Sequence, residues 1–295
     1  RRPRSVLGRL LQLATHPGPH QLGGNRPRLG FEGEALVLRD DKSPVVATGR
    51  RPPRRPYSGG VCTVNPMAPF APETFPRPVD PEILTAFDNV WDGLAGPGTW
   101  WTAAERVAIV AATRTSVPLP LGEVAPDPGG LSDIVGPDGL SALTREVVRR
   151  LAVDAGRITG DWAAVVVDRV GPGRYVEMVA LVVQTVPIDL LCDLLGRPHQ
   201  DLPTPRAGEP SQVVPDGLGQ EGAFVPWAVG AWFGPNVARA LSYVPDDNAR
   251  RMEVVMSMYS GGQHFGEMVW HHRALSRPQI ELVAARTSAI NECFY

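Results

Sequence analysis

The sequence is poor in cysteine and almost without lysine. Its 295 residues include three cysteines, Cys62, Cys192 and Cys293, and one lysine, Lys42. The cysteines are too few and too scattered to form the disulfide framework of a secreted domain. We therefore expect a reducing, cytoplasmic setting.

Two further features are missing. No run of about eighteen apolar residues suggests a membrane span. Gly171-Pro-Gly173 lacks the glycine and lysine that a phosphate-binding loop requires after it. A mean hydropathy of −0.10 and 43% hydrophobic residues are typical of a soluble globular protein. We expect no membrane partner and no cofactor.

The first 66 residues differ in composition from the rest. They hold 12 of the 29 Lys and Arg but 4 of the 31 Asp and Glu, and they are rich in Pro and Gly without a sustained period. Such a segment buries too little apolar surface to offset chain entropy. We expect a disordered extension, or sequence upstream of a true start at Met67. The arginines are scattered without interleaved aromatics, which argues against a nucleic-acid partner. Arg9 and Gln12 interrupt the apolar run of a signal peptide.

From Met67 onward, nearly every element is predicted to be a helix. Asp80-Pro81 is a start signal, and Thr102 with Glu105 forms a capping box. Trp162–Val170 is rich in β-branched residues, which favour a strand, but it lies between predicted helices, so we interpret it as helical. The fold class is therefore all-α, a helical bundle. The predicted helices cover 81–95, 107–117, 140–151, 162–170, 174–195, 235–243, 246–265 and a final helix from about Arg277.

Two stretches are not predicted to be helical. Leu119–Gly139 is a long Pro/Gly-rich loop, either a lid or an insertion. Residues 197–223 are rich in Pro, Gly and polar residues, and we interpret them as a linker. On the predicted helix 140–151, Arg145, Arg149 and Arg150 lie on the outward face, where we expect solvated side chains.

The last twenty residues carry the strongest local signals. Ser276 and Gln279 form a capping box that starts a helix near Arg277. Asn291 is a suitable N-cap for a second helix, whose first turn would favour a thiolate at Cys293. We expect one face of the first helix to be buried, with Glu281 beside it. The apolar positions of that face are Ile280, Val283, Ala284 and Ile290.

The chain also repeats itself weakly. Ile109–Ser116 aligns with Glu281–Ser288 through a shared Arg-Thr-Ser. Tyr175-Val-Glu177-Met-Val-Ala180 echoes Gln279-Ile-Glu281-Leu-Val-Ala284, and in that register Asp189 takes the place of Cys293. We interpret residues 67–196 as a first, degenerate repeat and residues 224–295 as a second.

The segments Leu275-Ser-Arg-Pro-Gln-Ile-Glu281 and Ile290-Asn-Glu-Cys293-Phe-Tyr295 resemble the core motif of the alkylhydroperoxidase D-like proteins, in the carboxymuconolactone decarboxylase superfamily. That motif has a Glu twelve residues before a Cys-x-x-Cys, with a His shortly after, on an all-helical fold that commonly oligomerises. Glu281 and Cys293 have this separation. The second Cys would follow Tyr295, and the later His is also missing, so the sequence looks like a fragment cut inside its site.

The resemblance implies a chemistry. In such enzymes a relay of Glu, His and water deprotonates the peroxidatic thiol, which becomes a sulfenic acid and is then resolved to a disulfide. It assigns Cys293 as the attacking thiol and Glu281 as the proton acceptor. His264 and His271 are candidates for the relay. A metal site at these two histidines, His272 and Glu267 is not expected, because nearby glycines interrupt a helix there.

Three functions follow from these residues. The first is a thiol-dependent alkylhydroperoxide reductase, an antioxidant oxidoreductase with little turnover in the chain as given. The alternatives are a lactone decarboxylase-type enzyme, which needs acid and base groups but no cysteine pair, and a non-enzymatic helical oligomerisation protein. The expected partners are a small hydroperoxide or lactone, a thiol reductant protein and further copies of the chain. A structural role would instead make Cys293 a core cysteine, with Glu281 paired to Arg286, and we expect core packing of Cys192.

Overall fold

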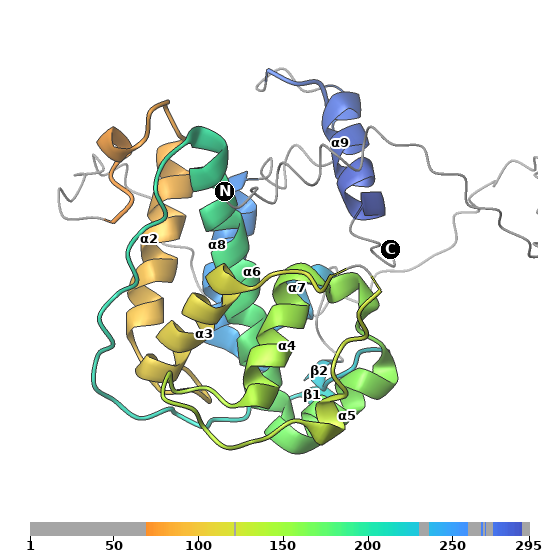
Figure 1. The fold of residues 1–295 in the computed structure, drawn as a ribbon. Coiled ribbons are helices and arrows are strands. Elements are labelled where there is room, and N and C mark those ends of the chain that lie inside the picture. The colour runs from red at the N-terminus through yellow and green to blue at the C-terminus, as the bar shows by residue number, and fades with distance from the viewer. Residues whose placement is uncertain are drawn as a thin grey trace, which may run out of the picture. The chain divides into compact units, whose positions relative to one another are not determined.

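The structure is a computed structural model of the chain. It describes residues 69–120, 122–229, 236–258, 267, 269 and 274–290, all within one compact unit that spans Val61–Tyr295. The described part is mostly helical, which confirms the all-α prediction (Figure 1). The predicted extension, residues 1–66, lies outside the described residues.

The elements are η1 (Pro72–Thr74), α2 (Pro81–Ala95), α3 (Ala103–Thr115), η2 (Pro128–Gly130), α4 (Ala142–Val153), η3 (Ala155–Arg157), α5 (Gly160–Val170), α6 (Pro172–Leu195), β1 (Leu218–Gly219), β2 (Trp227–Ala228), α7 (Asn236–Arg239), α8 (Pro245–Met258) and α9 (Arg277–Ile290).

The starts of α2 and α3 are those that the sequence predicts. The Asp80 side chain accepts a hydrogen bond from the Glu82 backbone N–H, with Pro81 at the first helical position. At α3 the Thr102 side chain accepts from the Glu105 N–H and the Glu105 carboxylate accepts from the Thr102 N–H. At each of these two helix starts, a side chain therefore binds one of the backbone N–H groups that the helix leaves open.

Helix α6 lies at the centre of the described fold. It contacts α3, α4, α5 and α8, and α2 packs against α3 and α8. Pro187 lies inside α6, which continues past it to Leu195. The buried apolar side chains form two clusters, one around α3–α6 and one around α2, and α6 contributes to both.

By length and composition, α6 could also cross a membrane. Among the described residues it is the one helix with an 18-residue window apolar enough, with a mean hydropathy of 1.9. The absence of a membrane partner stays a prediction, because the core helix of a globular protein meets the same criterion of length and composition. Half of that window is buried inside the protein, as in the core helix of a globular domain.

The predicted linker is not a free connection. Its backbone binds α2 and the turn after it: the Arg206 N–H donates to the Ala95 carbonyl at 2.7 Å, and the Gln212 N–H donates to the Thr99 carbonyl at 2.8 Å. The chain then forms the two-stranded antiparallel pair β1–β2. This segment therefore lies against the end of α2 and the turn after it, held by backbone hydrogen bonds.

Two other expectations change, and a third is tested only in part. Helix α7 has four residues, so the predicted helix 235–243 is much shorter. Helix α8 ends at Met258, and residues 259–266 lie outside the described part. Arg149 pairs with Glu146 at 2.6 Å, the guanidinium of Arg150 stacks over Trp162, and Arg145 donates to Asp138 at 2.8 Å. All three arginines predicted to be solvated are therefore held by the protein.

Candidate functional site

Helix α9 carries the predicted acid. It begins at Arg277 as predicted, and the Gln279 side chain accepts a hydrogen bond from the Ser276 backbone N–H at 2.8 Å. The Glu281 carboxylate lies 3.4 Å from the Arg277 guanidinium, one turn back, rather than pairing with Arg286. Its side chain is 62% exposed. Glu281 is therefore open to solvent.

The rest of the predicted site cannot be placed beside it. Cys293, His264 and His271 lie outside the described residues. Within the described residues, no group of three or more His, Cys, Asp or Glu side chains has the spacing of a metal site.

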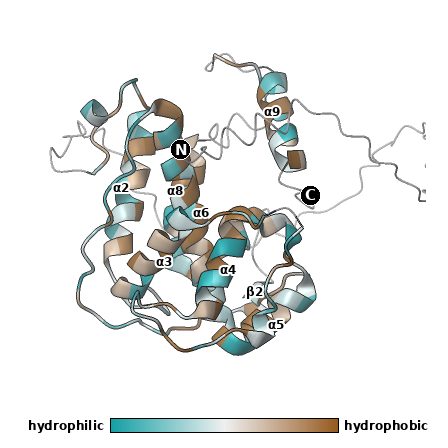
Figure 2. Ribbon diagram, viewed as in Figure 1, coloured by the Kyte–Doolittle hydropathy of each residue, from teal (hydrophilic) through white to brown (hydrophobic). Residues whose placement is uncertain are grey.

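No residue of α9 is buried, so the predicted buried face is wrong for the single chain. Leu282, Val283 and Ile290 are all exposed. Figure 2 shows hydrophobic and hydrophilic residues interleaved along this helix. The apolar residues of α9 do recur at helical spacing, but spacing alone does not show whether another part of the same chain packs against them.

The acid at the equivalent position of α6 has the opposite environment. Glu177 is completely buried and pairs with Arg106 of α3, which also pairs with Asp247 of α8. The Arg106 guanidinium donates to Glu177 Oε1 and makes two bonds of 2.9 Å to the Asp247 carboxylate. Glu177 Oε2 accepts from the Trp100 backbone N–H at 2.6 Å. Arg250 also binds Asp247, at 3.0 Å.

The pKa values of the two carboxylates in this buried cluster are shifted in opposite directions. Burial raises the pKa of Glu177 above its ordinary value, and the charge of Arg106 offsets this only in part. Burial also acts to raise the pKa of Asp247, but the hydrogen bonds and charge of Arg106, then those of Arg250, outweigh it and hold that pKa low. The same contacts raise the pKa of Arg106 against the opposing effect of burial. Asp247 is therefore the firmer partner of Arg106.

This cluster has little room for a substrate. The cavity beside Arg106 is about 10 Å³, about the size of one water molecule. Both Glu177 oxygens are already bound by protein donors. We interpret the cluster as structural: it fixes α3, α6 and α8 to one another. Sequence reasoning missed Arg106 and Asp247, although a charged residue at the start of the strongly apolar helix was a usable signal.

The end of α6 holds the residues that align with the cysteine motif. Asp189, at the aligned position of Cys293, is bound by both Nε and Nη2 of Arg114 at 2.8 Å. His199 lies 3.8 Å from the same carboxylate. Cys192 is fully buried, as predicted, and burial raises the pKa of its thiol against the lowering effect of Arg197. A thiol in this state is a poor nucleophile.

No family model matches the chain, and no curated protein or solved structure matches it either.

Proposed function

We propose that this chain is a carboxymuconolactone decarboxylase-superfamily protein that acts as a thiol-dependent alkylhydroperoxide reductase, with Cys293 as the attacking thiol and Glu281 as its proton acceptor. The proposal rests on the motif that joins these two residues. The observation that supports it is the exposed carboxylate of Glu281 on a helix that ends at Ile290, three residues before Cys293.

The reaction has two steps. Glu281 accepts the thiol proton, directly or through water, and the thiolate sulfur attacks the terminal oxygen of the hydroperoxide. An S–O bond forms as the O–O bond breaks, the sulfur is oxidised to a sulfenic acid, and the alkoxide takes a proton and leaves as an alcohol. A thiol reductant then condenses with the sulfenic acid, releasing water and leaving a mixed disulfide that a second thiol reduces.

The environment of Cys192 argues against that residue as the attacking thiol. Cys192 is buried with a raised pKa, so peroxide reaches it poorly and finds little thiolate. His264 and His271 remain the proposed relay between Glu281 and the thiol.

Peptide-level mass spectrometry tests the proposal. The reduced protein is treated with tert-butyl hydroperoxide, and dimedone traps sulfenic acid at each cysteine over time. We expect Cys293 to be oxidised faster than free cysteine, and Glu281→Gln to slow it about a hundredfold, the lower range for loss of a general base. Glu209→Gln, at an exposed carboxylate outside the motif, is the matched control. Equal rates in Glu281→Gln and wild type would sink the assignment.

We also propose that the protein is a homo-oligomer. The support is the set of exposed apolar side chains on α9, which the chain itself leaves uncovered. Sedimentation velocity on wild type and Val283→Glu tests this, since a buried charge at the subunit interface would weaken association. A monomeric wild type at all concentrations would exclude it.

A further inference from the structure

Helix α6 presents a row of exposed apolar side chains. Half of its most apolar 18-residue window is buried in the protein, and the other half is not. The exposed apolar side chains in its C-terminal part are Val183, Val186, Leu190 and Leu194, which we call the α6 stripe. They follow one another in steps of three or four residues, so they lie on one face of the helix. A contiguous apolar surface of this kind marks an interaction site.

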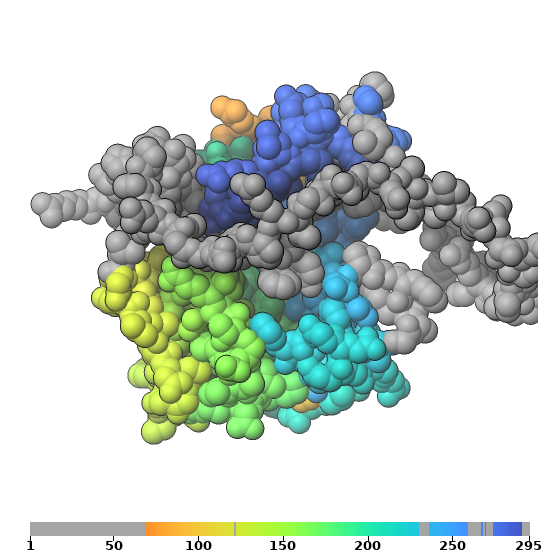
Figure 3. Space-filling model, turned by 90° about the vertical axis from the view of Figure 1, so that its right-hand side faces the viewer, coloured from red at the N-terminus to blue at the C-terminus, as the bar shows by residue number. Residues whose placement is uncertain are grey.

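Helix α9, none of whose residues is buried, carries a second apolar face. Leu282, Ala285 and Ala289 recur in steps of three and four residues, which places them on one side of the helix. Val283 and Ile290 lie beside them and are also exposed. The side chains of α9 (dark blue) lie at the molecular surface in Figure 3. At about 1.5 Å per residue, α9 is about 21 Å long and the α6 stripe about 17 Å, so the two faces are similar in length.

The charged groups beside the two faces are complementary. Arg286 lies on the apolar face of α9, one turn after Leu282, and forms no ion pair with any described residue. Beside the α6 stripe, Asp193 is 61% exposed, and His199 lies 2.9 Å from its carboxylate. The Asp193 carboxylate is therefore accessible to a second partner. Opposite charges that meet across an interface fix the register of the two surfaces.

We propose that α9 of one copy packs on the α6 stripe of a second copy, with Arg286 facing Asp193. The contact is mutual, so a two-fold dimer makes it twice, and each copy gives one helix and receives one. This docking rests on the homo-oligomer proposed above and adds the surface that receives α9, and it stands whether or not the chain is a peroxidase. A lipid surface is less suited to the stripe, because Asp193 would meet anionic lipid headgroups.

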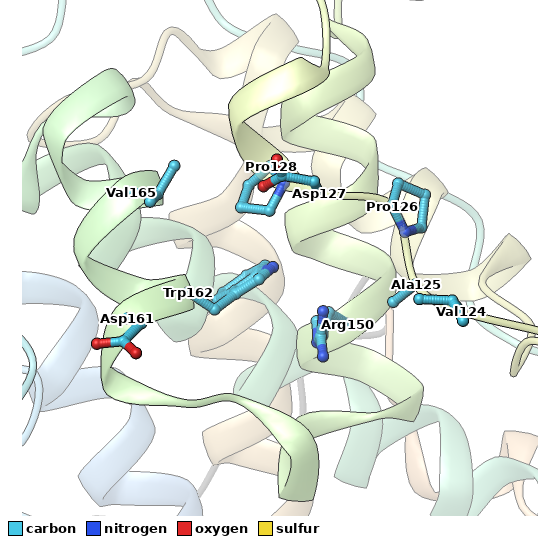
Figure 4. Close-up of a pocket in the computed structure, with 9 residues that line it drawn as sticks. All are labelled: Val124, Ala125, Pro126, Asp127, Pro128, Arg150, Asp161, Trp162 and Val165. Atoms are coloured by element: carbon cyan, nitrogen blue, oxygen red, sulfur yellow. The ribbon is translucent and has the colours of Figure 1, made fainter.

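Sedimentation velocity on wild type and Val186→Lys tests the receiving surface. The substitution places a charge of the same sign as Arg286 within the stripe, and should weaken self-association at least about tenfold. Val165→Lys is the matched control, since Val165 is 38% exposed and Val186 is 40% exposed. Val165 lies on α5 at an open hollow that Asp161, one turn earlier, also lines (Figure 4). A lysine there can pair with Asp161 and should leave self-association unchanged.

Two charge reversals decide whether the contact joins two copies. Asp193→Arg and Arg286→Asp each place like charges at both contacts of the dimer, and each should weaken self-association about tenfold. In an equimolar mixture, a dimer of one Asp193→Arg chain and one Arg286→Asp chain has opposite charges at both contacts. We expect this mixed dimer to form about as tightly as wild type. Mixing would restore nothing if α9 packed on the stripe of its own chain.

Thermal melts check that each variant folds. A wild type that is monomeric at all concentrations would overturn both this docking and the proposed homo-oligomer. A self-association that is unchanged in Val186→Lys would overturn the docking alone. A mixture of the two charge variants that associates no better than either variant would overturn docking between copies.

Vesicle flotation, with phosphatidylcholine and phosphatidylglycerol in equal parts, tests the lipid alternative. We expect neither wild type nor Val186→Lys to float with the vesicles. Flotation of wild type that Val186→Lys abolishes would make the stripe a lipid-binding surface and overturn the proposal.

Discussion

Helices α6 and α9 carry similar sequences in opposite environments. Tyr175–Ala180 and Gln279–Ala284 align, with a glutamate at the same position. Glu177 is completely buried and bound to Arg106, whereas Glu281 is 62% exposed and pairs with Arg277. The same residue type is thus buried in an ion-pair cluster in one helix and open to solvent in the other. Burial, not the local motif, decides which role a carboxylate has.

Among the tests of this contrast, Arg106→Met has the largest expected effect on the free energy of unfolding. The change leaves two buried carboxylates without their shared cation, and breaking a buried ion pair costs about 3–5 kcal/mol. Urea unfolding followed by far-UV circular dichroism measures the free energy of unfolding. Arg106→Lys is the matched control, since it keeps the charge and should lose less. A loss below about 1 kcal/mol in Arg106→Met would show that the cluster contributes little to the fold.

A second test uses the aligned arginines Arg114 and Arg286. Arg114 binds Asp189 through two nitrogens and donates to the Gln200 carbonyl at 2.8 Å, whereas Arg286 is exposed. We expect Arg114→Met to lower the free energy of unfolding by about 2–3 kcal/mol, because charged hydrogen bonds are lost. Arg286→Met should change it by about 0.5 kcal/mol at most. Equal losses at the two sites would contradict the difference in burial.

The sequence predicted what local signals control. The caps at Asp80 and Thr102 place two helix starts, and helical flanks correctly overruled the β-branched composition of α5. Prediction from the sequence failed where a residue binds a partner that is distant in the chain. Arg106 binds residues 71 and 141 positions away, and the covering surface for α9 cannot be read from its own periodicity.

A smaller effect is expected in the pH dependence of stability. The raised pKa of Glu177 means that the folded state holds this proton more tightly than the unfolded state does. The contribution of Glu177 is therefore fully present below its ordinary pKa of 4.5 and is lost as pH rises through the higher folded pKa.

The comparison with Glu177→Gln isolates this contribution. Urea unfolding of wild type and variant across a pH series should show wild type losing stability relative to the variant as pH rises above 4.5. Glu281→Gln is the exposed control and should follow wild type. A difference between wild type and Glu177→Gln that grows in favour of wild type with rising pH would reverse the assigned direction.

The smallest expected effect is at Leu282, the residue aligned with Met178. Met178 is fully buried and Leu282 is 71% exposed. At protein concentrations where the chain is monomeric, Leu282→Gln should change the free energy of unfolding by about 0.5 kcal/mol at most, because no buried contact is lost. Met178→Gln places an amide among apolar side chains and should be clearly destabilising. If Leu282→Gln is as costly as Met178→Gln under those conditions, α9 is covered by its own chain, and Glu281 is no more available for chemistry than Glu177.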